Sequence, residues 1–425
     1  MVRIRSAAVV ALVLVVGTPA LADPPARRTC GTVTPQVSFL APSDCDLGRT
    51  VINGEYEDGR TLVVQVVFHV IETTSGLGAL TEDHIRSQID ILNEDFQGIV
   101  GTPGEGGANS QIQFALARFD PAGNPTNGID RVVSNTFFTD PGAGSFNNDM
   151  KIALNWDPTR YLNIYTNDCA QGLLGYATFP ATEAGDTQDG VVLLWESVGR
   201  NGPGGPPYNQ GRTATHEIGH YLGLFHTFEG GCSPASYTSG DLIADTQAES
   251  QPIYDCVPNT PSGCGAGLAP IDNYMDYTND TCMDHFTAEQ ANRMRCSIMN
   301  YRLVNAAPIA AFEVDGGGLD VGFQDMSTDD ETPDQLQYFW DFGDGFGAQD
   351  RDPSHEYAEE GVYTVRLEVV DPDSGSGIAV QDIEVTASAG CCDTGAGGGP
   401  GASLLSVPVL MIVLRRRRRA ASSLS

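Results

Sequence analysis

The stretch THEIGHYLGLFH, from Thr215 to His226, constrains this chain more than any other part of its sequence. His216 and His220 are four residues apart, so on a helix both imidazoles leave the same face, about 40° apart around the axis. Two neutral imidazoles at this spacing can bind one zinc ion at roughly 2.0–2.1 Å. Glu217 lies one step around the helix, where it can reach a water molecule without being a ligand. The stretch therefore predicts a zinc-binding helix.

A third ligand follows the helix. Gly223 permits the left-handed turn that ends the helix, and the chain then doubles back to deliver His226. Three protein ligands leave a fourth position open, which is the arrangement of a catalytic zinc. The alternative is an amphipathic helix with surface histidines, but three of the seven histidines fall within eleven residues. This is the extended zinc signature of the metzincin metalloproteases, which the chain resembles.

The chain also supplies the methionine turn of that clan, in residues 273–277 (NYMDY). The sequence around this turn (residues 273–282) and the residues His226-Thr227-Phe228 resemble those of the pappalysin family. The resemblance extends over roughly residues 30–302. The resemblance implies an α+β metzincin domain, with a twisted sheet and helices above the cleft and a loop-rich, disulfide-tied lower subdomain. It also implies roles for three residues: Glu217 as general base, Tyr277 as the tyrosine that steadies the reaction intermediate, and Met275 as packing beneath the metal.

These features predict a zinc endopeptidase acting on proteins and peptides. The rival from another class is a surface binding or adhesion protein on a degenerate protease scaffold. Glu217 distinguishes the two hypotheses. Relatives that only bind tend to lose the general base, whereas this chain retains it. A zinc enzyme with a non-peptide substrate is a third reading that the motif alone leaves open.

Charge and targeting signals indicate export. The formal net charge of −32 excludes nucleic acid as a partner, because a phosphate backbone would be repelled. Residues 1–22 read as a secretory signal, with basic residues, an apolar run too short to span a bilayer, and a small-residue cleavage site. We therefore expect a secreted protein, in which the ten cysteines can form disulfides.

Residues 23–60 are expected to be a propeptide. Cys30, in the sequence RTCGT, resembles the cysteine switch of the pappalysins. Its thiolate would be a fourth zinc ligand in a latent form of the enzyme. The alternative is a disulfide between Cys30 and Cys45.

The catalytic domain is expected to span residues 61–304. The apolar run 61–71 predicts a buried central strand, in which His69 is a packed core residue, and Thr81 caps a helix that reaches Phe96. Further elements are expected, namely strands at residues 111–119, 128–133, 161–166 and 190–195, and helices at residues 146–156 and 286–301. Alternation of strands and helices predicts an α+β or α/β upper subdomain.

Residues 173–177 (LLGYA) resemble the exposed edge strand with which metzincins pair their substrates in antiparallel fashion. Gly175 and Tyr176 would then contact the substrate. An ordinary interior strand is the alternative.

The lower subdomain contains four cysteines, which allow three pairings. The resemblance implies Cys232 with Cys264 and Cys256 with Cys282. It also implies a calcium loop at residues 240–246, in which the ligands would be Asp241, Asp245 and Thr246. The alternative is a solvated acidic loop. Cys169 and Cys296 are left as a further candidate pair.

The resemblance also implies a specificity. Asp280 lies two residues before Cys282, where the pappalysin pattern places the acidic base of the S1′ pocket. A desolvated carboxylate there would select arginine, or less strongly lysine, and cleavage would fall on its N-terminal side. Self-processing before Arg49 or Arg60 would be an activation route. The alternative is that Asp280 is a solvated turn residue.

The rest of the chain carries no catalytic motif. Residues 308–388 alternate apolar and polar positions, and FWDFGDG (residues 339–345) resembles a polycystic-kidney-disease-type (PKD) module, a small all-β sandwich. Residues 389–425 comprise a Gly-rich linker, a short apolar run and five arginines. They resemble MYXO-CTERM sorting tails, which would give transient membrane attachment and surface display; the alternative is a simple C-terminal anchor.

Overall fold

The central element of the fold is the strand β1 (Leu62–Glu72), which neighbours strands on both sides. It pairs in parallel with β2 (Ile112–Leu116), β3 (Ile129–Val133) and β4 (Tyr161–Asn167). Beyond β4 lie β6 (Val191–Leu194), again parallel, and then β5 (Gly175–Ala177), which is the antiparallel edge strand. The predicted buried strand at residues 61–71 is thus confirmed, and its apolar side chains face both layers of the core.

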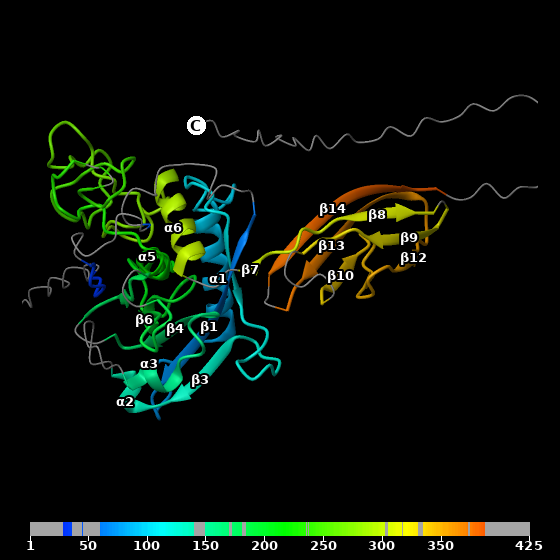
Figure 1. Cartoon of the computed structure of the whole chain (residues 1–425), viewed down its shortest axis with the longest axis horizontal. Coiled ribbons are helices and arrows are strands. Elements are labelled where there is room, and N and C mark those ends of the chain that lie inside the picture. The colour runs from blue at the N-terminus through cyan, green and yellow to red at the C-terminus, as the bar shows by residue number, and fades with distance from the viewer. Residues whose placement is uncertain are drawn as a thin grey trace, which may run out of the picture.

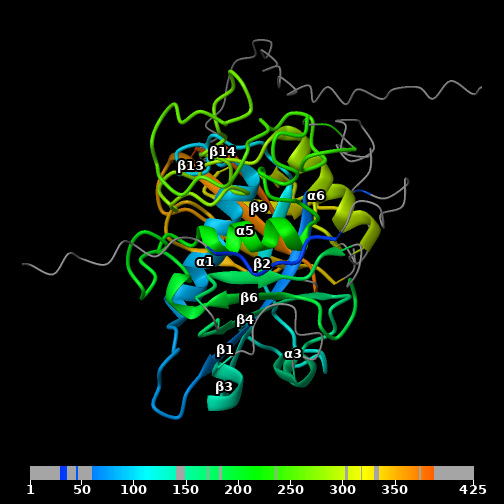
Figure 2. The ribbon, with the colours of Figure 1, turned by 90° about the vertical axis from the view of Figure 1, so that its left-hand side faces the viewer.

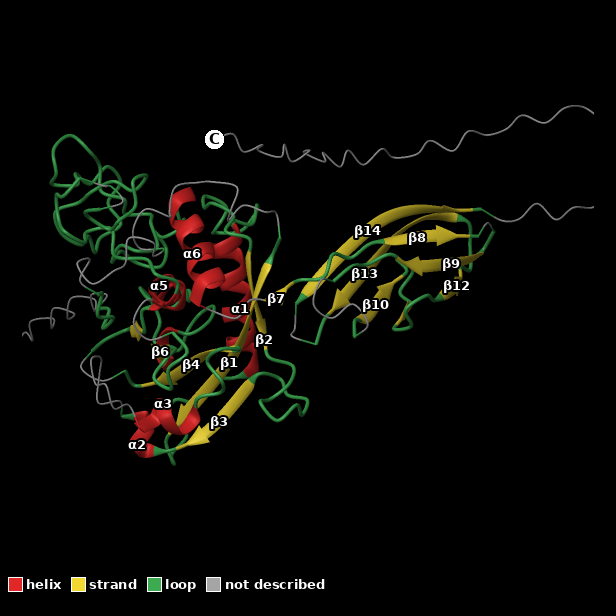
Figure 3. Cartoon of the chain, viewed as in Figure 1, coloured by secondary structure: helices red, strands yellow, loops and turns green. Residues whose placement is uncertain are grey.

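The coordinates are a computed structural model, drawn in Figure 1 and, by secondary structure, in Figure 3. The structure describes residues 29–35, 45, 60–139, 149–169, 172–180, 184–234, 236, 238–301, 305–316, 318–329, 335–372 and 375–386. The predicted signal peptide and C-terminal tail lie outside these residues. Among the residues described, no helix is both long enough and apolar enough to cross a bilayer.

Two helices pack over the sheet beside the predicted zinc-binding helix. In α1 (Glu82–Gln97), Thr81 is the N-cap as predicted, since its side chain accepts a hydrogen bond from the amide of His84, and Gly98 ends the helix in the left-handed conformation. The helix α6 (Ala288–Tyr301) lies within the predicted range 286–301. Both helices bury one face against a core that also includes β1, β4 and β6.

Short elements complete the first domain. The helix predicted at residues 146–156 is present as α3 (Asp149–Leu154), whereas the single turn α2 (Asn135–Phe138) and the 3₁₀ turn η2 (Trp195–Ser197) were not predicted. His69 is a buried core residue as expected, and its ring nitrogens lie 3.0 Å from Asp130 Oδ2 and 2.9 Å from Asn163 Oδ1.

The lower subdomain is mostly loop and is held by disulfides. The structure joins Cys232 to Cys264 and Cys256 to Cys282, the interleaved pairing that the resemblance implied. The other cysteine predictions are corrected. Cys296 is bonded to Cys45, so neither the Cys30–Cys45 disulfide nor the Cys169–Cys296 pair forms. The physical reason is proximity, because the Cα atoms of Cys45 and Cys296 lie 5.7 Å apart.

The second domain is an all-β sandwich with its own core around Trp340 and Leu367. One sheet has the order β11-β10-β13-β14 and the other the order β12-β9-β8. Their bounds are β8 (Phe312–Asp315), β9 (Asp320–Asp325), β10 (Gln337–Asp341), β11 (Gly347–Ala348), β12 (Ser354–Glu356), β13 (Gly361–Val370) and β14 (Ser376–Val385).

The sandwich joins the first domain at the edge far from β5. The two-residue strand β7 (Asn305–Ala306) pairs with the start of β1, and the Gln113 amide donates a hydrogen bond to Ser376 Oγ at 3.2 Å. In Figure 3 the sandwich accordingly lies beside β2 and β7, on the side of the sheet away from β6. The described residues of the second domain therefore lie away from the β5 edge.

A buried ion pair joins α1 to α5 (Arg212–Tyr221), the predicted zinc-binding helix. Asp95 is fully buried, and its two carboxylate oxygens accept hydrogen bonds from Arg212 Nη2 at 2.9 Å and from Thr215 Oγ1 at 2.6 Å. Burial raises the pKa of Asp95 to about 6, although Arg212 and Thr215 favour its charged form. At neutral pH the pair is therefore ionised and holds the first turn of α5 against α1.

We expect the Asp95→Ala substitution to lower the free energy of unfolding by about 3–5 kcal/mol, because it leaves Arg212 buried without its carboxylate. Chemical denaturation of the purified protein measures the change. The matched control is Glu82→Ala, which breaks the exposed ion pair with Arg86 and should cost at most about 1 kcal/mol. Equal effects of the two substitutions would contradict this role of Asp95.

Candidate metal centre and cleft

The helix α5 is buried along its entire length, and its two ends are fixed by specific contacts. Before its first residue, Gly211 adopts the left-handed conformation (φ 79°), and Asp280 Oδ2 accepts hydrogen bonds from the amides of Gln210 at 2.8 Å and Arg212 at 3.4 Å. After its last turn, Gly223 also has positive φ (91°), as the sequence predicted. The chain then returns toward the helix and brings His226 to it.

Three imidazoles and one thiol converge at this point. One ligand atom from each of Cys30, His216, His220 and His226 lies within 4.8 Å of the others. His216 Nδ1 is 2.7 Å from the carbonyl oxygen of Tyr274, and His220 Nδ1 is 2.7 Å from that of Leu224. A carbonyl can only accept, so each Nδ1 carries the proton and each Nε2 presents a lone pair.

These donors fit a zinc ion. The Nε2 atoms of His220 and His226 lie 3.0 Å apart, so a cation bound between the rings is a partner that both nitrogens could share. Burial lowers the pKa of His220 to about 4, and burial together with His220 lowers the pKa of His226 well below its usual value. Both rings are therefore neutral at pH 7, which ligation requires. The backbone carbonyls on the outer nitrogens are the usual supporting partners of metal-binding histidines.

The methionine turn packs directly beneath α5. Met275 is fully buried, and a methyl group added to Gly219 would lie about 2.5 Å from its sulfur. Glycine at this helical position therefore leaves room for the Met275 side chain, which a larger residue would displace. The same turn supplies the Tyr274 carbonyl that orients His216, so the turn supports the site through packing and through one hydrogen bond.

The carboxylate of Glu217 faces the N-terminal segment, which we define as residues 29–35. Its Oε2 atom accepts a hydrogen bond from Thr32 Oγ1 at 2.8 Å, and Cys30 Sγ lies 3.4 Å from the same oxygen. Gly175 on β5 also approaches this carboxylate, since a Cβ atom there would meet Glu217 Cγ at 2.8 Å. The glycine thus leaves room for Glu217 against the edge strand.

The N-terminal segment lies along β5 and crosses the site. The Gly31 amide donates to the Gly175 carbonyl at 2.9 Å, the Leu174 amide donates to the Thr29 carbonyl at 2.9 Å, and the two chains run parallel. Figure 2 shows this segment, in dark blue, passing between α5 and the end of the sheet. It therefore occupies both the backbone groups of the edge strand and the space in front of Glu217.

Tyr277 also lies at the site. Its ring centroid is 5.7 Å from that of His216 and 5.0 Å from that of His226. Burial, with Cys30 and Glu217 adding to it, raises the pKa of its hydroxyl above the usual range, so the phenol keeps its proton and can donate a hydrogen bond. Tyr176, the other predicted substrate contact, is buried and packs with Tyr165 and Val192.

The remaining predicted residues are placed as follows. Asp280 is 2% exposed, so the alternative of a solvated turn residue is wrong, and its carboxylate accepts hydrogen bonds at the start of α5. Asp241 and Thr246 are together, since Thr246 Oγ1 donates to Asp241 Oδ2 at 2.6 Å. Asp245 instead faces α6, where it accepts hydrogen bonds from the Thr287 hydroxyl and the Glu289 amide.

Two residues near the site had no sequence signal. Thr32 hydrogen-bonds the predicted base, and it also accepts from the Ala177 amide at 2.8 Å. Glu249 is fully buried and accepts from the Thr227 hydroxyl at 2.6 Å. Threonine and glutamate are common in loops, so only the proximity of Thr32 to Cys30 in the chain could have suggested a role.

Comparison with known proteins is consistent with this geometry. Residues 145–299 match the family described as pregnancy-associated plasma protein-A peptidases, and residues 305–387 match the PKD domain. The chain is 34% identical over 299 residues to extracellular metalloprotease 1 of Coccidioides posadasii, covering 68% of this chain and 96% of that protein.

Two solved structures of proteins with similar sequences were also found. Mature mirolysin of Tannerella forsythia in complex with a cleaved peptide is 38% identical, with 55% of this chain and 90% of that chain covered and a TM-score of 0.46. A promirolysin mutant from the same organism is 34% identical, with 60% and 84% covered and a TM-score of 0.49.

Proposed function

The chain belongs to the extracellular metalloproteases of the pregnancy-associated plasma protein-A (pappalysin) family, and from this premise we propose that it is a zinc endopeptidase held latent by its own N-terminal segment. That it is a secreted metalloendopeptidase with an appended PKD domain follows from the family. The metal, the role of each residue, the specificity and the latency are our proposals. The convergence of three histidines and Cys30 on one point is the observation that supports the metal and the latency.

In the active form, His216, His220 and His226 would hold the zinc ion. When bound there, zinc lowers the pKa of water to about 7 and polarises a carbonyl group. The protein supplies the proton transfers. Glu217 would take the proton from the attacking water and pass it to the nitrogen of the leaving amine. The protonated hydroxyl of Tyr277 would donate a hydrogen bond to the oxygen on which negative charge develops.

The edge strand β5 would bind the substrate backbone. Gly175 and Leu174 use their main-chain groups for the N-terminal segment, which shows that this edge can pair with an extended chain. A substrate would pair antiparallel to β5, whereas the N-terminal segment runs parallel to it. The two therefore compete for the same edge but in opposite directions.

Latency would follow from three contacts made together. Cys30 would be the fourth zinc ligand, Thr32 covers the Glu217 carboxylate, and the backbone of the segment occupies β5. A bound thiolate would fill the position that water needs. The base and the substrate edge would be blocked at the same time, so the segment must leave before turnover.

We also propose that the loop at residues 240–246 binds calcium. Its support is a buried group of acidic side chains, because burial and the nearby charges of Asp276 and Asp241 raise the pKa of Glu249 to about 8. A divalent cation with oxygen ligands would offset this repulsion. Attachment to a membrane through the tail is likewise a proposal from sequence, as is the surface location.

Specificity would depend on Asp280. The buried carboxylate lies at the start of α5, and Asp280 is two residues before Cys282, whose disulfide with Cys256 would fix the wall of the S1′ pocket. A desolvated carboxylate favours a cationic partner, and arginine can engage it with two parallel hydrogen bonds. We therefore propose cleavage on the N-terminal side of Arg, and less strongly of Lys.

The Glu217→Ala variant should lose peptide hydrolysis by at least about 10²–10⁴-fold while it retains zinc, because Glu217 is a base and not a ligand. The measurement is turnover of a peptide library by activated enzyme, with and without a chelator, together with the zinc content. Glu217→Gln, which keeps the side-chain shape, should be similarly inactive. Near-normal turnover of either variant with intact zinc stoichiometry would contradict the mechanism.

The Cys30→Ala variant of the full-length chain should be more active than the wild-type precursor, because without the zinc–thiolate bond the N-terminal segment would dissociate more readily and water could enter the fourth position of the zinc. Initial rates of peptide cleavage before any processing test this. Cys169→Ala, which removes a buried thiol distant from the zinc ligands in sequence, is the matched control and should leave the precursor latent. Disulfide mapping that finds Cys30 bonded to Cys45 in the inactive precursor would exclude the switch.

The Asp280→Asn variant should lose the preference for basic residues at P1′, by a factor corresponding to about 2–5 kcal/mol if the pair is buried. Asparagine keeps an oxygen that can accept from the Gln210 amide, so the start of α5 stays anchored and only the charge is removed. Profiling both enzymes on one proteome-derived peptide library measures the change. Absence of basic enrichment at P1′ in the wild type would end the hypothesis.

A further inference from the structure

The disulfide between Cys45 and Cys296 joins two parts of the chain to which we have assigned different roles. Cys45 follows the N-terminal segment and precedes β1, so it lies within the predicted propeptide. Cys296 is on α6, in the core of the catalytic domain. The two cysteines are 251 residues apart in sequence. A covalent bond therefore links the propeptide to the catalytic domain. In sequence, this bond follows the N-terminal segment that crosses the site.

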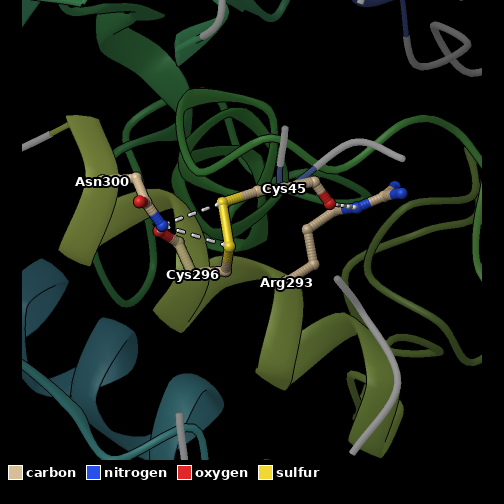
Figure 4. The surroundings of a disulfide bond; sticks show 4 residues. All are labelled: Cys45, Arg293, Cys296 and Asn300. Carbon is tan, nitrogen blue, oxygen red and sulfur yellow. Dashed lines mark hydrogen bonds between the residues drawn. A yellow bond between two sulfur atoms is a disulfide. The ribbon is translucent and has the colours of Figure 1, made fainter. Parts of the chain in front are cut away.

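The surroundings of Cys45 are those of a catalytic-domain residue (Figure 4). Cys45 and Cys296 are 1% and 0% exposed. Arg293 donates from Nε to the Cys45 carbonyl at 3.3 Å and, from its terminal nitrogens, to the carbonyls of Asp241 and Leu242. Asn300 Nδ2 lies 3.4 Å from each sulfur. The same guanidinium thus fixes Cys45 and a loop of the lower subdomain.

Among the described residues, the blocking contacts are made by the N-terminal segment, which precedes Cys45 in the chain. They are the hydrogen bonds of Thr29 and Gly31 to β5, those of Thr32 to Glu217 and Ala177, and the approach of Cys30 to the histidines. A cut at Arg49 or Arg60 breaks none of them and does not touch the disulfide. It hydrolyses one peptide bond, and the N-terminal fragment stays bonded to α6 through sulfur.

We propose that the Cys45–Cys296 disulfide is a tether that keeps the N-terminal segment on the catalytic domain after any cut that follows Cys45, and that Cys45 remains part of the active enzyme. The proposal rests on the latency proposed above. A tethered segment rebinds intramolecularly, at an effective concentration on the order of millimolar, whereas a released fragment is diluted into the medium. Only a cut before Cys45 frees the segment and leaves the tether in place.

The tether also indicates which class of protease activates the enzyme. Residues 29–48 contain no lysine or arginine. An endopeptidase that requires a basic residue at P1′ therefore has no site between Cys30 and Cys45, and its own cuts before Arg49 or Arg60 yield a latent two-chain form. Activation then needs a second endopeptidase that does not depend on basic residues. Self-processing at Arg49 or Arg60 is thus a processing event without release.

The test compares two positions of one cut in the full-length, zinc-loaded chain. In one protein, a recognition sequence for a site-specific protease is inserted after Ser38, which precedes Cys45 in the chain. In the other protein, the same sequence is inserted after Gly54, which follows Cys45. Each protein is cut to completion, and its mass is measured without reductant together with its rate on a peptide substrate. We expect the cut after Ser38 to release the fragment and raise the rate at least about ten-fold, and the cut after Gly54 to leave mass and rate nearly unchanged.

A third protein carries the cut after Gly54 together with Cys45→Ser and Cys296→Ser, and it should lose the fragment and become active on cutting. If this variant does not fold, the comparison of the two cut positions still decides. Equal activation by both cuts, with the fragment still attached after Gly54, would overturn the tether, as would failure of both cuts to activate. A fully active uncut chain would instead contradict the latency itself.

Discussion

The site depends on one requirement, which is that two neutral imidazoles on one helix present their Nε2 lone pairs to the same point in a dry interior. Two hydrogen bonds satisfy this requirement. His216 Nδ1 donates to the Tyr274 carbonyl, and His220 Nδ1 donates to the Leu224 carbonyl. The first bond requires the methionine turn beneath α5, and glycine at position 219 leaves room for the Met275 side chain. The buried Asp95–Arg212 pair and the cap from Asp280 then fix the helix from the other side.

The same requirement explains how one short segment can block the enzyme. Ligands, base and substrate edge lie within reach of a few residues, because Gly175 brings β5 against Glu217. An extended chain on β5 therefore meets all three. The sandwich domain joins the opposite edge of the sheet through β7 and takes no part in this. In the mechanism proposed here, the N-terminal end of the chain would control the site, and the disulfide at Cys45 would determine how that end can leave.

The sequence predicted local features of the site well. The ligand spacing, the turn at Gly223, the cap at Thr81 and the central strand are each determined by residues within one turn or strand. The contacts between distant segments were not predictable in the same way. Thr32 with Glu217, Asp95 with Thr215 and Cys45 with Cys296 join residues of ordinary type, and no periodicity marks them. The orientation of the Asp245 side chain toward α6 is a further case, because the sequence of an acidic loop does not indicate which way each carboxylate points.

X-ray absorption at the zinc edge tests the central claim most directly, since it reports the ligands of the metal without requiring activity. The full-length precursor should show three nitrogen neighbours at roughly 2.0–2.1 Å and one sulfur at about 2.3 Å. The sulfur should be absent from the Cys30→Ser protein and from the enzyme after release of its N-terminal segment. A precursor with one zinc ion but no sulfur neighbour, or a sulfur that persists in the Cys30→Ser protein, would contradict the account.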